Sequence, residues 1–151
     1  MELGKAGCVA QIDFYLKNKE YDKAHGLAGE FVSRFPDEMV SHFLLSRSAF
    51  ELGLYAEAVN EGSRALNKAV SDKDMLACAV LTGSAYYMSG RYQEGIKLMH
   101  FMEQKKTSED LERLFILLAL AIKDGKEAAE HLNDLYQINK VAADEIIRRY
   151  L

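Results

Sequence analysis

The residues most able to do chemistry are four histidines, and their spacing points away from catalysis. They are His25, His42, His100 and His131. They lie far apart and without a paired nucleophile. No two have the His-x-x-x-His spacing that places two metal ligands on one helix face. We interpret them as surface or groove-edge histidines. The sequence therefore predicts no enzyme, no catalytic residue, no metal site and no cofactor.

The two cysteines, Cys8 and Cys78, both lie in apolar helical stretches. We interpret them as buried thiols that act as small hydrophobic side chains. Cys78 has no nearby base, so a reactive thiolate is not expected. This usage suits a reducing compartment, and the chain leads directly into an amphipathic helix without a signal-peptide pattern. We expect an intracellular protein, cytoplasmic or nuclear.

Composition limits the class of partner. The chain has 151 residues, of which 49% are hydrophobic and 28% charged, so it can build one domain with a core. Its net charge of −4 argues against nucleic acid, whose binding proteins usually carry a basic face. The longest strongly apolar run, 114–122, is too short for a bilayer. We therefore expect neither a nucleic-acid partner nor membrane insertion.

Apolar residues recur at helical spacing, and the alternation typical of strands is absent. Glycines at 53, 90 and 125 are expected to end helices by adopting the left-handed conformation. The predicted helices cover 5–18, 21–34, 38–52, 55–69, 73–89, 92–105, 108–123, 126–138 and 141–150.

The chain also nearly repeats itself. Segment 83–96 is echoed by segment 46–59, and a third copy covers 13–25. The shared tyrosines give the period, because 34 residues separate Tyr21 from Tyr55 and 37 separate Tyr55 from Tyr92. A helical unit of this length cannot bury its own apolar face and must stack on its neighbours. The repeat predicts a solenoid.

These units resemble tetratricopeptide repeats, the 34-residue helix–turn–helix units in which small residues lie where two helices cross. The third unit matches best, with Gly83, Tyr86, Tyr92 and Gly95 in family positions. The second supplies Tyr55, Ala58 and Ala65, and the first supplies Tyr15, Tyr21, Ala24 and Pro36. The fourth keeps Gly125, Ala128, Leu132 and Leu135 but lacks both aromatic residues.

The resemblance implies an all-α fold: a right-handed α-solenoid of about four helix-turn-helix units plus a C-terminal capping helix. We expect a single domain over 1–151. Its units would cover about 5–36, 37–71, 72–107 and 108–138, with the cap at 141–150. In the cap, Asp144, Glu145, Arg148 and Arg149 are expected to face solvent.

The family places the first helix of each pair along a concave groove. The spacing predicts a central set of partner-binding residues: Phe43, Leu44, Arg47, Phe50, Val80, Leu81, Ser84, Tyr87 and Met88. The fourth unit would add Asp110, Arg113, Leu114 and Leu117. A largely apolar groove suits a helical or extended peptide segment of a partner. The resemblance thus implies an adaptor, scaffold or chaperone-like holder. The plainer alternative is that these aromatic residues are simply core.

One family partner is disfavoured, and one alternative stays open. Members that bind the acidic C-terminal tail of heat-shock chaperones use Lys, Asn and Arg side chains. Here those positions hold Val9, Asp13, Leu44, Ala77 and Leu81, which cannot bind two carboxylates.

The alternative is a self-associating structural subunit of a multiprotein complex, such as a homodimer. Subunits of the anaphase-promoting complex and secretion-system chaperones are built from similar repeats.

Overall fold

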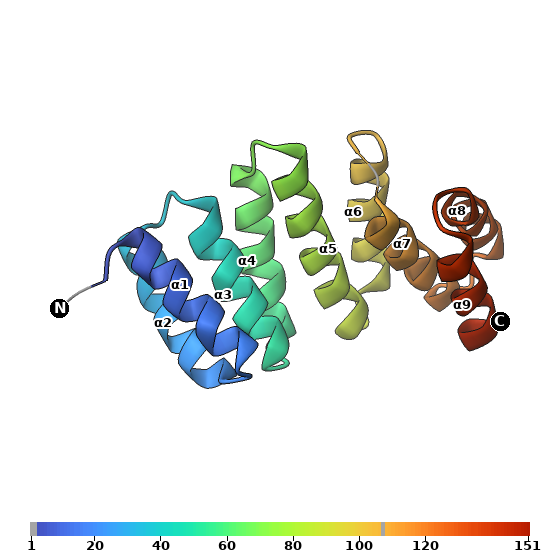
Figure 1. The fold of residues 1–151 in the computed structure, drawn as a ribbon. Coiled ribbons are helices and arrows are strands. Elements are labelled where there is room, and N and C mark those ends of the chain that lie inside the picture. The colour runs from blue at the N-terminus through green and yellow to red at the C-terminus, as the bar shows by residue number, and fades with distance from the viewer. Residues whose placement is uncertain (1–2, 107) are drawn as a thin grey trace.

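In the computed structural model, described for residues 3–106 and 108–151, nine helices follow one another along an elongated stack (Figure 1). They are α1 (Lys5–Lys17), α2 (Tyr21–Arg34), α3 (Met39–Glu51), α4 (Tyr55–Lys68), α5 (Asp72–Met88), α6 (Tyr92–Glu103), α7 (Glu109–Ala121), α8 (Gly125–Ile138) and α9 (Lys140–Tyr150). All regular secondary structure in the described ranges is helical, which confirms the predicted fold class. The predicted helix ends agree with these bounds within two residues. The predicted unit boundary at 107 lies outside the described residues.

The helices pack as four consecutive pairs and a final helix. We call α1–α2 unit one, α3–α4 unit two, α5–α6 unit three and α7–α8 unit four. Each helix contacts the next one along the chain, and the first helices also contact one another, α1 with α3, α3 with α5 and α5 with α7. The first helices therefore form one continuous row, which faces the viewer in Figure 1.

A small residue occupies the same position in the second helix of every unit. These residues are Ala24, Ala58, Gly95 and Ala128, and all are buried. At Gly95 a Cβ atom would lie 2.8 Å from Leu118 Cδ2, closer than packed atoms allow. Small side chains thus let the helices cross closely, as ridge-into-groove packing requires.

The turn inside each unit also recurs, and it corrects one prediction. A residue with positive φ ends the first helix in every unit, at Lys19, Gly53, Gly90 and Lys123. The next residue then donates a backbone hydrogen bond to a carbonyl of that helix, as Leu54 does to Ala49 O at 2.9 Å. The prediction for Gly125 is wrong, because Gly125 is the first residue of α8. Lys123 takes the left-handed position instead, with φ of 60°.

None of the helices in the described ranges combines the length and the apolar character needed to cross a membrane.

Candidate functional site

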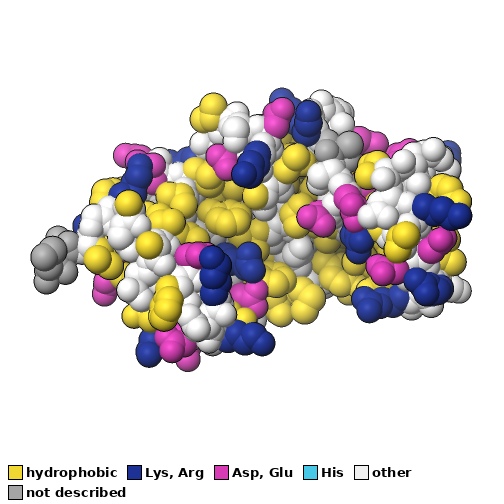
Figure 2. Space-filling view, in the orientation of Figure 1, with side chains coloured by type: hydrophobic (Ala, Val, Ile, Leu, Met, Phe, Trp, Pro, Cys, Tyr) yellow, Lys and Arg dark blue, Asp and Glu magenta, His cyan; other side chains and the backbone are white. Residues whose placement is uncertain are grey.

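A cavity of about 520 Å³ opens on the row of first helices, between α3, α5 and the start of α7. Figure 2 shows hydrophobic side chains gathered over this part of the face, with charged side chains around them. The lining residues are Phe43, Arg47, Phe50, Glu51, Lys73, Leu76, Ala77, Val80, Leu81, Ser84, Ser108 and Asp110. We call this cavity the groove.

Six of the nine residues predicted as the central contact set line the groove: Phe43, Arg47, Phe50, Val80, Leu81 and Ser84. The other three lie elsewhere. Leu44 is buried in the cluster beneath unit one. The Tyr87 ring packs against Tyr92, with centroids 5.8 Å apart. Met88 is 51% exposed at the end of α5.

The groove aromatics serve the core and the surface together. Phe50 lines the groove, yet its ring also packs edge-on against Tyr55 of the second helix, with centroids 5.5 Å apart. Arg47 is ion-paired to Glu51 at 3.4 Å, so the rim is charged. Sequence reasoning missed Lys73, Leu76 and Ser108. Lys73 and Leu76 lie two turns and one turn before Val80, and that spacing could have identified them.

A second cavity, of about 500 Å³, lies between α7 and the capping helix α9. Its lining residues are Arg113, Leu117, Glu145, Ile146, Arg148, Arg149 and Tyr150. Three residues expected only to solvate the cap, Glu145, Arg148 and Arg149, thus line a cavity. The cap also exposes Ile147, Tyr150 and Leu151.

Two groups near this cavity fix the start of α7. Asn139 and Arg113 both donate hydrogen bonds to Glu109 Oε1, at 3.1 and 2.9 Å. These bonds, and then the nearby Arg113 charge, lower the pKa of the Glu109 carboxyl. Within the described residues, the buried Arg113 Nε has no hydrogen-bond partner. The junction of α7, α8 and α9 is therefore tied by polar contacts.

A polar triad in unit two has two buried members, His42 and Glu61, and one exposed member, Arg64. His42 Nδ1 lies 2.7 Å from Glu61 Oε2, and His42 Nε2 lies 2.6 Å from Pro36 O. Arg64 Nη1 donates to the other oxygen of Glu61 at 2.6 Å. The His42 and Glu61 side chains are 6% and 9% exposed. Both nitrogens of His42 thus face an acceptor.

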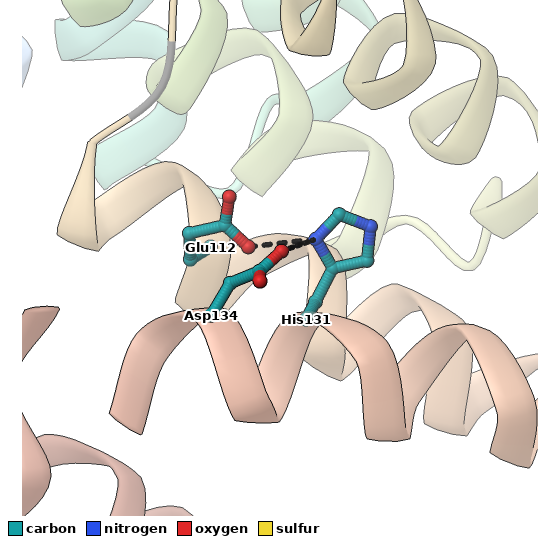
Figure 3. A group of neighbouring side chains, drawn as sticks. All are labelled: Glu112, His131 and Asp134. Atoms are coloured by element: carbon teal, nitrogen blue, oxygen red, sulfur yellow. Dashed lines mark hydrogen bonds and ion pairs between the residues drawn. The ribbon is translucent and has the colours of Figure 1, made fainter. Parts of the chain in front are cut away.

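A second triad lies in unit four and is drawn in Figure 3. His131 Nδ1 lies 2.6 Å from Glu112 Oε2 and 4.0 Å from Asp134 Oδ2. The His131 side chain is 4% exposed, and its ring stacks on Phe115 with centroids 3.6 Å apart.

The carboxylates around His131 set its titration. Burial alone would lower the His131 pKa, but the hydrogen bond with Glu112 and the charges of Glu112, Glu103 and Glu127 outweigh it and raise the pKa. The interpretation of these histidines as surface residues is wrong for His42 and His131. Each lies within hydrogen-bond distance of a glutamate on the neighbouring helix. The residue spacing within one helix cannot predict such a contact.

The unit-four triad is also a group of potential metal ligands. One ligand atom from each of Glu112, His131 and Asp134 lies within 4.8 Å of the others. However, the 2.6 Å between His131 Nδ1 and Glu112 Oε2 is a hydrogen-bond distance. Two ligands of one tetrahedral ion stand about 3.3 Å apart, since each metal bond is about 2.0 Å. An ion on this side would have to break that bond.

The cysteines offer no reactive thiol. Cys8 and Cys78 are buried and free, which confirms their interpretation as small buried side chains. Burial, and then the charge of Asp74, raise the pKa of Cys78 to about 12. A thiol with that pKa stays protonated at neutral pH and is a poor nucleophile.

Comparison with known proteins supports the fold and does not assign a function. No protein-family model matches the sequence. No curated protein sequence matches it either. Among solved structures, a chain described as "MamA MSR-1 C2", a tetratricopeptide-repeat protein, superposes with a TM-score of 0.72 at 15% identity. The alignment covers 99% of this chain and 80% of that one. The predicted resemblance is thereby confirmed at the level of fold, which is that of tetratricopeptide-repeat proteins.

Proposed function

We propose that this chain is a protein-interaction module that binds a helical or extended peptide segment of a partner in the groove. A tetratricopeptide-repeat fold implies protein partners, and its scaffold is typically non-enzymatic. The supporting observation is the cavity of about 520 Å³ between α3 and α5, whose walls combine apolar and aromatic side chains with a charged rim. An exposed apolar patch of this kind commonly marks an interaction site. We assign the chain no catalytic role, and its intracellular location stays a prediction.

The shape of the groove favours a short amphipathic ligand. Val80 and Leu76 are partly buried and line its floor, and Arg47 and Lys73 lie at its edge. An apolar stripe of a ligand would contact the floor, while its polar residues would face a rim that carries both basic and acidic side chains, Arg47 and Lys73 with Glu51 and Asp110. Six of the nine predicted contact residues belong to this surface. We propose that the other three, Leu44, Tyr87 and Met88, only support the packing around it.

Selection of peptides from a displayed random library tests the groove without knowledge of the partner. The affinity of a selected peptide is measured by fluorescence anisotropy for wild type, Val80→Asp and Val70→Asp. Val70 is 93% exposed outside the groove, so it is the matched control for the same substitution. Val80→Asp should weaken binding by about tenfold or more, because a charge in the apolar floor must be desolvated, and Val70→Asp should change it little.

Helicity by circular dichroism should be equal in the three proteins. Equal affinity of all three for every selected peptide would place the binding surface elsewhere and refute the proposal. Val80 serves this purpose better than Leu81, since Leu81 is only 8% exposed and a charge there would also test folding.

Self-association is the second candidate, and the exposed face of α9 favours it. Ile147, Tyr150 and Leu151 are 41%, 45% and 71% exposed and follow one another at helical spacing. A second copy of the chain could cover them in a twofold arrangement. Light scattering coupled to size exclusion tests this directly. A dimer that Ile147→Glu converts to a monomer supports the candidate, and a monomeric wild type at about 100 μM excludes it at the affinities typical of stable dimers.

A further inference from the structure

The cavity between α7 and α9 carries more positive charge than the groove. Its walls hold three basic side chains, Arg113, Arg148 and Arg149, and one acidic side chain, Glu145. The walls of the groove hold basic and acidic side chains in equal number. Because the chain as a whole has a net charge of −4, the excess of arginine here is a local feature. We call the cavity between α7 and α9 the arginine cavity.

In the described part of the chain, two of these three guanidinium groups have no acidic partner. Arg113 is ion-paired to Glu109 at 2.9 Å, which holds its guanidinium in place. Arg148 donates only a long bond of 3.4 Å, from Nε to the backbone oxygen of Asp144, and Arg149 forms no ion pair among the described residues. Guanidinium groups bind carboxylates through two parallel hydrogen bonds. The donors of Arg148 and Arg149 are therefore open to an anion from outside the chain.

The remaining walls of the arginine cavity are apolar or aromatic. Leu117, Ile146 and Tyr150 complete a space of about 500 Å³. Apolar walls beside a few charged groups suit a short aliphatic chain that ends in a carboxylate, as an aspartate or glutamate side chain does. A polyanion such as nucleic acid fits less well, because Glu145 in the wall and the negative net charge of the chain would repel it.

The arginine cavity continues the surface that carries the groove. Asp110 lines the groove and Arg113 lines the arginine cavity, and the two lie three residues apart on one face of α7. The end of α9 also reaches toward α5. Burial, and then the nearby Tyr150 and Tyr92 side chains, raise the pKa of Tyr87 on α5. A segment bound in the groove can thus extend over α7 into the arginine cavity.

We propose that the arginine cavity binds side-chain carboxylates of an acidic peptide segment, through Arg148 and Arg149 beside the fixed Arg113. The inference rests on the proposed function in taking a peptide as the ligand, and it adds the chemistry of one part of that ligand. The peptide would place an apolar stretch in the groove and aspartate or glutamate residues over α7 and α9. Charge complementarity of this kind selects partners and orients them.

Peptides selected from the displayed random library test the proposal. Each is synthesised with an amidated C-terminus, so that only side-chain carboxylates remain. A second copy of each peptide carries Asn and Gln in place of Asp and Glu. We expect the selection to enrich acidic residues, and the neutral copy to bind about tenfold more weakly, since it loses hydrogen bonds between charged groups. Equal affinity of the two copies, measured by fluorescence anisotropy, would overturn the proposal.

A double variant assigns the effect to the arginine cavity. Arg148→Gln with Arg149→Gln should weaken binding of the acidic peptides by about tenfold and leave binding of the neutral copies unchanged. Arg91→Gln with Lys97→Gln is the matched control, because it removes two positive charges outside both cavities. Helicity and Tm should be equal in the two double variants and the wild type. If the control weakens binding as much as the arginine variant does, the effect is one of net charge and the proposal fails.

Val80→Asp reads the groove separately. If Val80→Asp weakens binding and the double arginine variant does not, the groove is retained and this proposal fails, because Arg148 and Arg149 then only offset the dipole at the end of α9. If the double arginine variant weakens binding of acidic peptides and Val80→Asp does not, the arginine cavity is a peptide site without the groove. If light scattering shows a wild-type dimer that the double arginine variant converts to a monomer, a second copy of the chain occupies the cavity and the proposal is wrong.

Discussion

Units two and four carry polar side chains at the same three positions, two of them buried and the third exposed, with acid and base exchanged. Unit two holds, in chain order, a base, an acid and a base: His42, Glu61 and Arg64. Unit four holds an acid, a base and an acid: Glu112, His131 and Asp134. In both units the first two are 19 residues apart and the third follows three residues later. The two units therefore place a buried histidine–glutamate pair at the same positions, with the histidine and the glutamate exchanged.

The two triads are not equivalent, because the central residue is Glu61 in unit two and His131 in unit four, and these side chains bind different numbers of partners. Glu61 offers two oxygens, and His42 and Arg64 each take one, at 2.7 and 2.6 Å. His131 directs only Nδ1 at its two acids, so Glu112 binds at 2.6 Å and Asp134 stays at 4.0 Å. The unit-two triad is closed. In unit four the second ring nitrogen, His131 Nε2, faces Glu127 Oε1 at 3.5 Å and Glu103 Oε1 at 3.9 Å instead.

The largest expected effect comes from breaking the closed triad. His42→Leu leaves Glu61 buried beside an apolar side chain and should cost about 3–5 kcal/mol in the free energy of unfolding. The double variant His42→Leu with Glu61→Leu removes both buried polar side chains and should recover most of that loss, since the corresponding positions in unit three hold Ala79 and Leu98. Urea unfolding followed by circular dichroism measures both.

The same double replacement in unit four sharpens the comparison. Glu112→Leu with His131→Leu should recover less of the lost free energy of unfolding. The double replacement also removes the buried imidazole that faces the two outer carboxylates, Glu103 at 3.9 Å and Glu127 at 3.5 Å. Equal recovery in the two units would show that the outer carboxylates add nothing to the difference between the triads.

The next effect arises beside the triad of unit two. Gly62 follows Glu61, and a Cβ atom there would overlap Thr82 Oγ1 on α5 and lie 3.0 Å from Ser46 Oγ. Gly62→Ala should therefore cost about 1–3 kcal/mol through overpacking. Gly26→Ala is the control, because nothing lies within 4 Å of its Cβ position and a helical alanine is favoured over glycine by about 0.5–1 kcal/mol. A thermal melt that ranks the two variants in the opposite order would contradict this packing account.

The comparison also shows what sequence reasoning could and could not reach. Helix positions followed from periodicity and from the repeat, since both depend on local spacing that a single sequence displays. Six of the nine predicted contact residues line the groove for the same reason, because residues on successive turns of α3 and of α5 face one side. Leu44 is buried in the core instead, because its environment depends on how unit one packs against unit two.

The contacts between histidines and acids on different helices could not be predicted from the sequence for a different reason. His42 and Glu61 lie on separate helices, as do His100 and Glu127, and their contact depends on the crossing of two helices. The expectation of surface histidines came from searching for partners within one helix. Aligning the four units by their turns would have exposed the reversed triads, because Gly53 and Lys123 occupy equivalent positions.

The turns give the third prediction, again between units two and four. Lys123 has φ of 60° and Gly53 has φ of 76°, so one unit carries a strained lysine where the other carries glycine. Lys123→Gly should stabilise the protein by up to about 1 kcal/mol, because a left-handed non-glycine residue costs about 1–2 kcal/mol and glycine loses part of that gain through its chain entropy. Gly53→Ala should destabilise it by about 1 kcal/mol. Urea midpoints of the two variants should move in opposite directions, and parallel shifts would contradict the shared turn geometry.

The smallest effect is expected at the third position of each triad. The Arg64 side chain is 62% exposed, so its bond to Glu61 is largely screened by water. Arg64→Ala should cost less than about 1 kcal/mol, even though the bond is only 2.6 Å long, because Glu61 keeps His42. Asp134→Ala should cost still less, since Asp134 is 60% exposed and forms no close bond to His131 at 4.0 Å. A loss at Asp134 that exceeds the loss at Arg64 in urea unfolding would mean that unit four, like unit two, depends on all three of its charges.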